Sequence, residues 1–205
     1  MSIKASVYII CKNEEKHIKR VLESIKEFDE IIVVDSGSTD KTLEIVKEYT
    51  DKIFYQEWLG FSAQKEFAKN LCKNEWVLNL DADEELTNEL KKEIEEVIKD
   101  DNVDGLDIPI SAKHNYDIKT KFLKYNRRVR FFRRSRGFYN KKLVHESIQV
   151  DGKIKKTKSF IFDYGTENIE KKIDKINNYS TLAVKEKSSK DKKYSILKLL
   201  FIFTL

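Results

Sequence analysis

Short apolar runs alternate in the first hundred residues with segments in which apolar residues recur every three or four positions. The runs are rich in β-branched and aromatic residues, which is typical of strands buried on both faces of a parallel sheet; they are 6–10, 31–35, 52–56 and 76–81. The periodic segments predict amphipathic helices; their apolar residues are Ile18, Val21, Leu22 and Ile25, then Leu43, Val46 and Tyr49, then Phe67, Ala68 and Leu71, then Leu90, Ile94, Val97 and Ile98. This order predicts an α/β fold, a Rossmann-like, mostly parallel sheet with helices on both faces.

Polar residues ahead of the periodic segments indicate where the helices begin. Asn13 and Thr87 are the expected caps of the first and last of them, and the cluster 36–40 precedes the second. A side-chain oxygen at such a position accepts a hydrogen bond from a backbone N–H in the first turn.

The residues directly after three of the strands are polar and charged. They read CKNEE (11–15), DSGSTD (35–40) and DADEE (81–85). Ligands of open α/β sheets bind outside the carboxyl ends of the strands. The three segments should therefore converge on one binding edge.

The carboxylates after the fourth strand favour a metal site. An extended Asp81-Ala82-Asp83 would place both aspartates on the same side of the chain. Two neighbouring carboxyl groups do not readily ionise together unless a cation compensates their charges. Mg²⁺ or Mn²⁺ does so with one or two protein carboxylates, water and substrate phosphates. Alternatively, the acidic residues could begin the next helix, where negative charge is favourable. This role suits Glu84 and Glu85 better than the two aspartates.

Composition sets the broad class of the protein. The chain has 205 residues, of which 40% are hydrophobic, and a single proline, which is enough for one domain with a sizeable core. Its two cysteines indicate reduced thiols and not a disulfide scaffold. The first residues lack the pattern of a signal peptide, so we expect a cytoplasmic protein.

Charge is distributed unevenly along the chain. Residues 1–110 hold 15 Lys/Arg and 26 Asp/Glu, whereas residues 111–160 hold 16 and 3. Six of the seven arginines lie within 127–136. Guanidinium groups bind phosphate or carboxylate through two parallel hydrogen bonds, which lysine cannot reproduce. We expect Arg128 and Arg130 to contact phosphate or the acceptor; the alternative is a solvated strand pair with a basic face.

The three acidic segments together resemble the family 2 glycosyltransferases, inverting sugar transferases of the GT-A fold. The resemblance is carried by IICKNEE (9–15), IIVVDSGSTDKT (31–42) and WVLNLDADEEL (76–86), in this order. LVHES (143–147), preceded by NRRVRFFRR (126–134), is similar to the lipopolysaccharide core β-glucosyltransferases.

The resemblance implies roles for individual residues. Asp35 would contact the nucleoside, Asp81 would lie near the ribose or uracil, and Asp83 would ligate the metal that bridges the donor diphosphate. Lys65 aligns with a basic residue near the diphosphate, although Glu66 follows it where many relatives carry asparagine. The residues expected to bind the donor are thus Asn13, Glu14, Asp35, Ser36, Lys65 and Asp81.

Inversion requires a carboxylate that removes the proton from the attacking acceptor hydroxyl. That base should be remote from the metal, and Glu146 is one of only three acidic residues in 111–160. A salt bridge to nearby arginines is the alternative role for it. The adjacent His145 could ligate the metal, contact the diphosphate, orient the acceptor or be structural.

The chain divides into three parts. Residues 1–110 would form the nucleotide-sugar-binding α/β half, 111–165 a smaller basic β segment of the same domain with the His-Glu motif, and 166–205 a helical tail. The tail ends in YSILKLLFIFTL. These twelve residues are fewer than the ~20 that cross a bilayer, so we expect a peripheral membrane anchor, a shortened helix or a docking helix.

Three functions are compatible with parts of this pattern. A nucleic-acid-binding module would explain the arginines but not the acidic strand ends. A nucleotidyltransferase acting on sugar phosphates would be expected to carry a glycine-rich loop after the first strand, and CKNEE has none. We predict a metal-dependent inverting transferase with no nucleic-acid partner. It would move a hexose from a UDP-linked donor to a glycan or glycolipid, such as lipopolysaccharide core, at the inner face of the cytoplasmic membrane.

Overall fold

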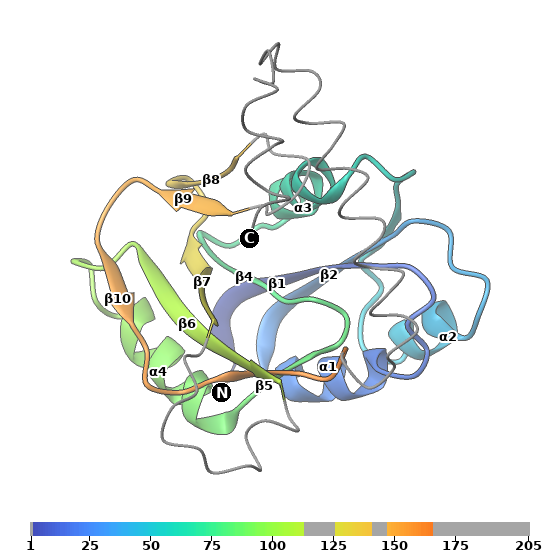
Figure 1. The fold of residues 1–205 in the computed structure, drawn as a ribbon, viewed down its shortest axis with the longest axis horizontal. Helices are drawn as coiled ribbons and strands as arrows, with labels where there is room; N and C mark the ends of the chain where they lie inside the picture. The colour runs from blue at the N-terminus through green and yellow to red at the C-terminus, as the bar shows by residue number, and fades with distance from the viewer. Residues whose placement is uncertain (1, 113–125, 141–146, 166–205) are drawn as a thin grey trace, which may run out of the picture.

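A computed structural model describes residues 2–112, 126–140 and 147–165 of the chain (Figure 1). In this part of the chain one nine-stranded sheet has the order β3-β2-β1-β4-β7-β6-β11-β5, and β10 pairs with the first three residues of β6. Its strands are β1 (Ile3–Cys11), β2 (Phe28–Asp35), β3 (Ile53–Tyr55), β4 (Trp76–Asn79), β5 (Glu84–Leu86), β6 (Gly105–Ala112), β7 (Asn126–Arg133), β10 (Ile154–Lys156) and β11 (Ile161–Asp163). Strands β1 to β4 run parallel, so their carboxyl ends share one edge.

Helices cover both faces of this sheet. One face carries α1 (Ile18–Ile25), α2 (Thr42–Val46) and α4 (Asn88–Ile98). The other carries α3 (Phe61–Asn70) and a small sheet of β8 (Gly137–Tyr139) and β9 (Ile148–Val150) (Figure 1). The strands and helices predicted in the first hundred residues are confirmed within a few residues at their ends.

Each face of the sheet has its own apolar core. On the α1 side Ile18, Leu22 and Leu90 pack on strand residues such as Leu78. Each fully buried aliphatic side chain of this kind stabilises the fold by roughly 1.5–3 kcal/mol. The second cluster, on the α3 side, consists of Tyr8, Ile32, Val34, Ala68, Cys72, Val77 and Phe132. The strands are thus buried on both faces, as their continuous apolar runs predict.

The helix starts agree with the prediction in one case and differ in another. Thr87 caps α4, since its Oγ1 accepts from the Leu90 backbone N–H at 3.3 Å. The assignment of Asn13 as the cap of α1 was wrong. That helix begins after His17. Asn13 lies in the preceding loop with a φ of 57°, and its side chain bonds to the backbone of Thr39.

The basic segment contributes strands to the same sheet as the acidic half. Strand β7 pairs antiparallel with β4 on one side and with β6 on the other. The register against β6 shifts so that Phe131 lies opposite Leu106 but Val129 lies opposite Asp107. Arg130 is the extra residue of this β-bulge, a device that re-aims a side chain.

The tail 166–205 lies outside the described residues. Among the helices that are described, none has the length and apolar content needed to cross a membrane.

Candidate functional site

The loops that follow β1 and β2 are bonded into one unit. The backbone N–H of Asn13 donates to Ser38 Oγ at 2.9 Å, and Asn13 Oδ1 accepts from the Thr39 N–H at 2.8 Å. Asparagine is one of the few residues that tolerate the left-handed conformation this requires. The backbone of Glu14 donates to Thr42 Oγ1 at 2.8 Å. Hydrogen bonds therefore join the two predicted donor-binding loops.

Asp35 shapes the loop in which it lies. Its Oδ2 accepts from the backbone N–H groups of Gly37 at 2.8 Å and Ser38 at 2.9 Å, and Ser38 Oγ donates to its Oδ1 at 2.5 Å. Gly37 has a φ of 92°, which favours glycine there. The carboxylate is 3% exposed, so its main visible role is to hold this turn. Its contact with a nucleoside stays a prediction.

Gln64 was missed by the sequence reasoning. This fully buried side chain donates to Ser36 Oγ at 3.0 Å and to the Gln56 carbonyl at 3.1 Å, and it accepts from the Leu59 N–H at 3.2 Å. It thereby fastens the loops after β2 and β3 to α3. One polar residue in a helix gives no local signal of such a role.

The segment Asp81-Ala82-Asp83 is a turn and not an extended strand end. The Glu84 N–H donates to the Asp81 carbonyl at 3.0 Å. The Glu84 carboxylate in turn accepts from the Asp81 N–H at 2.9 Å. The predicted extended alternation was wrong, because these two bonds close a turn before β5.

Protein cations compensate the carboxylates at this turn. Asp81 Oδ1 pairs with Lys65 Nζ at 2.8 Å, and its Oδ2 pairs with Arg130 Nη2 at 2.8 Å. The same Arg130 nitrogen lies 2.8 Å from Glu84 Oε1. The Lys65 and Arg130 side chains are 3% and 7% exposed. An apolar strand can therefore end in acidic residues because α3 and the bulge of β7 bring buried cations to them.

The two carboxyl groups of this cluster differ in acidity. Burial raises the pKa of Glu84 to about 8, against the attraction of Arg130 and with the help of the Asp81 charge. Burial also acts on Asp81, but Arg130 and Lys65 overcome it and hold the pKa of Asp81 well below its ordinary value. Asp81 is the permanent anion of the cluster.

Replacing Glu84 by glutamine should make stability less dependent on pH. A raised pKa means that the folded state holds an extra proton between about pH 4.5 and 8, so its stabilising effect is lost as pH rises through this window. Between pH 5 and 9 the free energy of unfolding of Glu84→Gln should rise relative to wild type, by on the order of 2 kcal/mol. Urea unfolding at several pH values measures this difference in the free energy of unfolding, with the exposed Glu95→Gln as control. A difference that does not change with pH would contradict the raised pKa of Glu84.

Asp83 has a separate environment from Asp81. Its carbonyl accepts from the Tyr164 N–H at 3.0 Å, and a Cβ at Gly165 would lie 2.0 Å from its Oδ2. The Asp83 carboxylate thus lies beside the backbone at residue 165, where an added side chain would require it to shift.

The donor set at this turn fits a metal that is shared with a substrate. No group of three or more His, Cys, Asp or Glu side chains that could hold a metal occurs in the described ranges. Both Asp81 oxygens face protein cations, and a metal-binding role for Asp83 and Asp81 stays a prediction. Mg²⁺ and Mn²⁺ are commonly held by one or two carboxylates together with substrate phosphates. His145, the other proposed ligand, lies outside the described residues.

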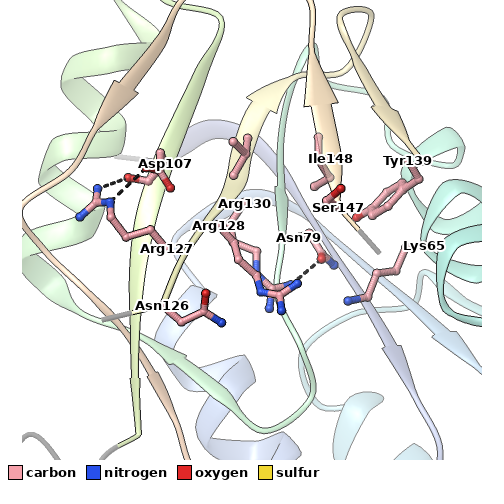
Figure 2. A pocket seen from close by; sticks show the side chains of 11 residues that line it. Lys65, Asn79, Asp107, Asn126, Arg127, Arg128, Arg130, Tyr139, Ser147 and Ile148 are labelled. Carbon is pink, nitrogen blue, oxygen red and sulfur yellow. Dashed lines mark hydrogen bonds and ion pairs between the residues drawn. The ribbon is translucent and has the colours of Figure 1, made fainter. Parts of the chain in front are cut away.

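A cavity of about 310 Å³ lies on the α3 side of β4 and β7 (Figure 2). Its lining includes Arg128 and Arg130, the two predicted phosphate or acceptor contacts, and Lys65. Tyr139, Ser147 and Ile148 also line the cavity, on the side of β8 and β9 (Figure 2). Glu146 and His145 lie outside the described residues, but Ser147 follows Glu146 directly in the chain.

Residues 6–160 match the family model of Glycosyl transferase family 2. The protein is a family 2 glycosyltransferase. An uncharacterized glycosyltransferase of Rickettsia typhi is 36% identical over 210 residues, which cover 96% of this chain and 72% of the relative. The lipopolysaccharide core biosynthesis glycosyltransferase LpsC of Rhizobium meliloti is 32% identical over 208 residues, or 96% of this chain and 76% of LpsC.

Staphylococcus aureus TarS, solved in complex with UDP-GlcNAc, is 30% identical over 54% of this chain and 34% of the TarS chain, with a TM-score of 0.44. The family 2 glycosyltransferase has the predicted α/β sheet, so the resemblance and the fold class are confirmed. Membership of the family selects the glycosyltransferase prediction over the nucleotidyltransferase and the nucleic-acid-binding module.

Proposed function

We propose that this family 2 glycosyltransferase inverts the anomeric centre as it transfers a hexose from a UDP-linked donor to a glycan or glycolipid. The main support is that α3 joins the two parts of the expected donor site. Gln64 bonds Ser36 in the loop after β2, and the next residue, Lys65, pairs with Asp81 after β4. A nucleotide at the carboxyl edge of the sheet would contact both loops.

Asp83 would hold Mg²⁺ or Mn²⁺ at this edge. When bound, the metal would neutralise the charge that develops on the departing diphosphate. The Asp81 side chain is one-third exposed and remains ionised, so it can accept hydrogen bonds from ribose hydroxyls or the base. Lys65 and Arg130 keep its carboxylate in one orientation while it does so.

Glu146 would act as the general base toward the acceptor hydroxyl. Its support is the position of Ser147, the next residue, on the wall of the basic cavity. Asn140 donates to the Ser147 hydroxyl at 2.6 Å and thereby fixes this wall. His145 would orient the acceptor or contribute to the metal site.

The acceptor would be an envelope glycan or glycolipid, such as lipopolysaccharide core, because LpsC is described as acting in its biosynthesis. The enzyme would work in the cytoplasm, with peripheral contact to the inner face of the membrane. The apolar tail 194–205 supports this location only through its sequence.

A donor screen tests the proposed function. UDP with Mn²⁺ at about 100 times its Kd should stabilise the protein by about 2.7 kcal/mol, which raises the melting temperature by roughly 5–10 °C. EDTA should remove most of this shift, and GDP or ADP should give less. Slow hydrolysis of an α-linked UDP-hexose should release the β-sugar first, as seen by NMR. A metal-independent shift or first release of the α-sugar would contradict the proposal.

A further inference from the structure

Two buried N–H donors beside the cavity have no partner among the described residues. Asn79 is 1% exposed and accepts from Arg130 Nη1 at 2.6 Å through its Oδ1, which leaves its Nδ2 unbonded. Arg130 Nε is also buried and unbonded. Each such donor costs about 1–3 kcal/mol if nothing accepts from it. Buried polar groups of native proteins nearly always have a partner, so these two indicate a ligand with acceptor atoms.

The charge of the cavity specifies this ligand further. Its lining carries four cationic side chains against the single carboxylate of Asp107; they are Lys65, Arg127, Arg128 and Arg130. Arg127 Nε pairs with Asp107 Oδ2 at 3.1 Å, so these two compensate each other. Lys65 and Arg130 also pair with Asp81, which is not part of the lining. A lining rich in cationic side chains, with two unbonded N–H donors, suits a phosphate or a carboxylate.

The position of the cavity favours the acceptor over the donor. Asp35, Asp81 and Asp83 do not line it, and Lys65 is the one residue of the expected donor set that does. The lining also contains Ser147, which follows the proposed base Glu146 in the chain. This cavity is therefore more readily assigned to the acceptor than to the donor.

We propose that the cavity binds an anionic group, a phosphate or a carboxylate, of the acceptor sugar, and that Asn79 Nδ2 and Arg130 Nε donate to it. This inference rests on the proposed function. The Nη2 atom of Arg130 holds Asp81 at the donor side, so one guanidinium faces both substrates. Asn79 is then a specificity-determining residue, because an acceptor without the anion leaves its amide buried and unbonded.

Matched sugars test the proposal by calorimetric titration in the presence of saturating UDP and Mn²⁺. Glucose 6-phosphate is compared with glucose, and galacturonate with galactose. We expect an anionic sugar to bind and its neutral counterpart to bind at least about tenfold more weakly. Binding of glucose 6-phosphate would identify a phosphate site, and binding of galacturonate would identify a carboxylate site.

Two variants locate the binding. Asn79→Asp replaces the donor with a negative charge and should weaken binding of the anionic sugar by at least about tenfold. Arg128→Gln removes a cation from the wall without changing the Asn79–Arg130 bond, and it should weaken binding as well. Asn88→Asp makes the same substitution at an exposed residue of α4 on the other face and should have no effect.

Several results would overturn the inference. Equal binding of neutral and anionic sugars, no binding of either anion, or unchanged affinity in Asn79→Asp would each do so. Competition between UDP and the anionic sugar would assign the cavity to the donor diphosphate instead. If UDP with Mn²⁺ itself fails to bind, the proposed function fails first, and that titration is measured separately.

Discussion

Glu146→Gln should lower the turnover number by about 10²–10⁴-fold and leave the Kd for UDP nearly unchanged. The amide keeps the size of the side chain but cannot take a proton from the acceptor hydroxyl. An inverting transferase forms no covalent intermediate on the enzyme, so no second group replaces the lost base. The residues proposed to bind the donor are others, at the carboxyl ends of β1, β2 and β4.

Release of UDP measured at saturating donor, together with a UDP titration, separates these two effects. The exposed Glu95→Gln on α4 is the matched control and should have the turnover of the wild type. Loss of UDP affinity in Glu146→Gln would assign Glu146 to the donor site. Full turnover would remove it from the mechanism.

The local pattern of the chain was sufficient for the first four strands and their helices. Continuous apolar runs such as 31–35 can be buried only between two layers, and the structure places helices on both faces there. The place of β7 between β4 and β6 could not be read in the same way. Its pairing with β4 joins residues more than 50 positions apart in sequence, and its bulge against β6 at Arg130 has no local signature.

The acidic residues of the candidate site were predicted from the sequence, but the cations that compensate them were not. Asp81 was expected to need a cation, and the cations are Lys65 and Arg130, which come from distant segments. Gln64 and Asn79 could not be identified from the sequence. The sequence does not distinguish a buried asparagine or glutamine from an exposed one, and only its partners in the folded chain reveal its role.

Asp83→Asn should remove most of the contribution of metal to donor binding. Asparagine keeps the shape of the side chain against Gly165 but lacks the charge that attracts a divalent cation. Without the metal, no divalent cation would neutralise the negative charge of the diphosphate at this edge. We expect the Kd for UDP in Mn²⁺ to rise by on the order of a hundredfold, equivalent to about 2.7 kcal/mol.

We propose that the acidic edge of the sheet holds a diphosphate through a metal on Asp83. Calorimetric titration of UDP with and without Mn²⁺ tests it in wild type, Asp83→Asn and the exposed control Asp101→Asn. The account predicts that Mn²⁺ tightens UDP binding in wild type and in the control, while Asp83→Asn binds as weakly with Mn²⁺ as wild type does without it. Undiminished Mn²⁺-dependent affinity in Asp83→Asn would contradict it.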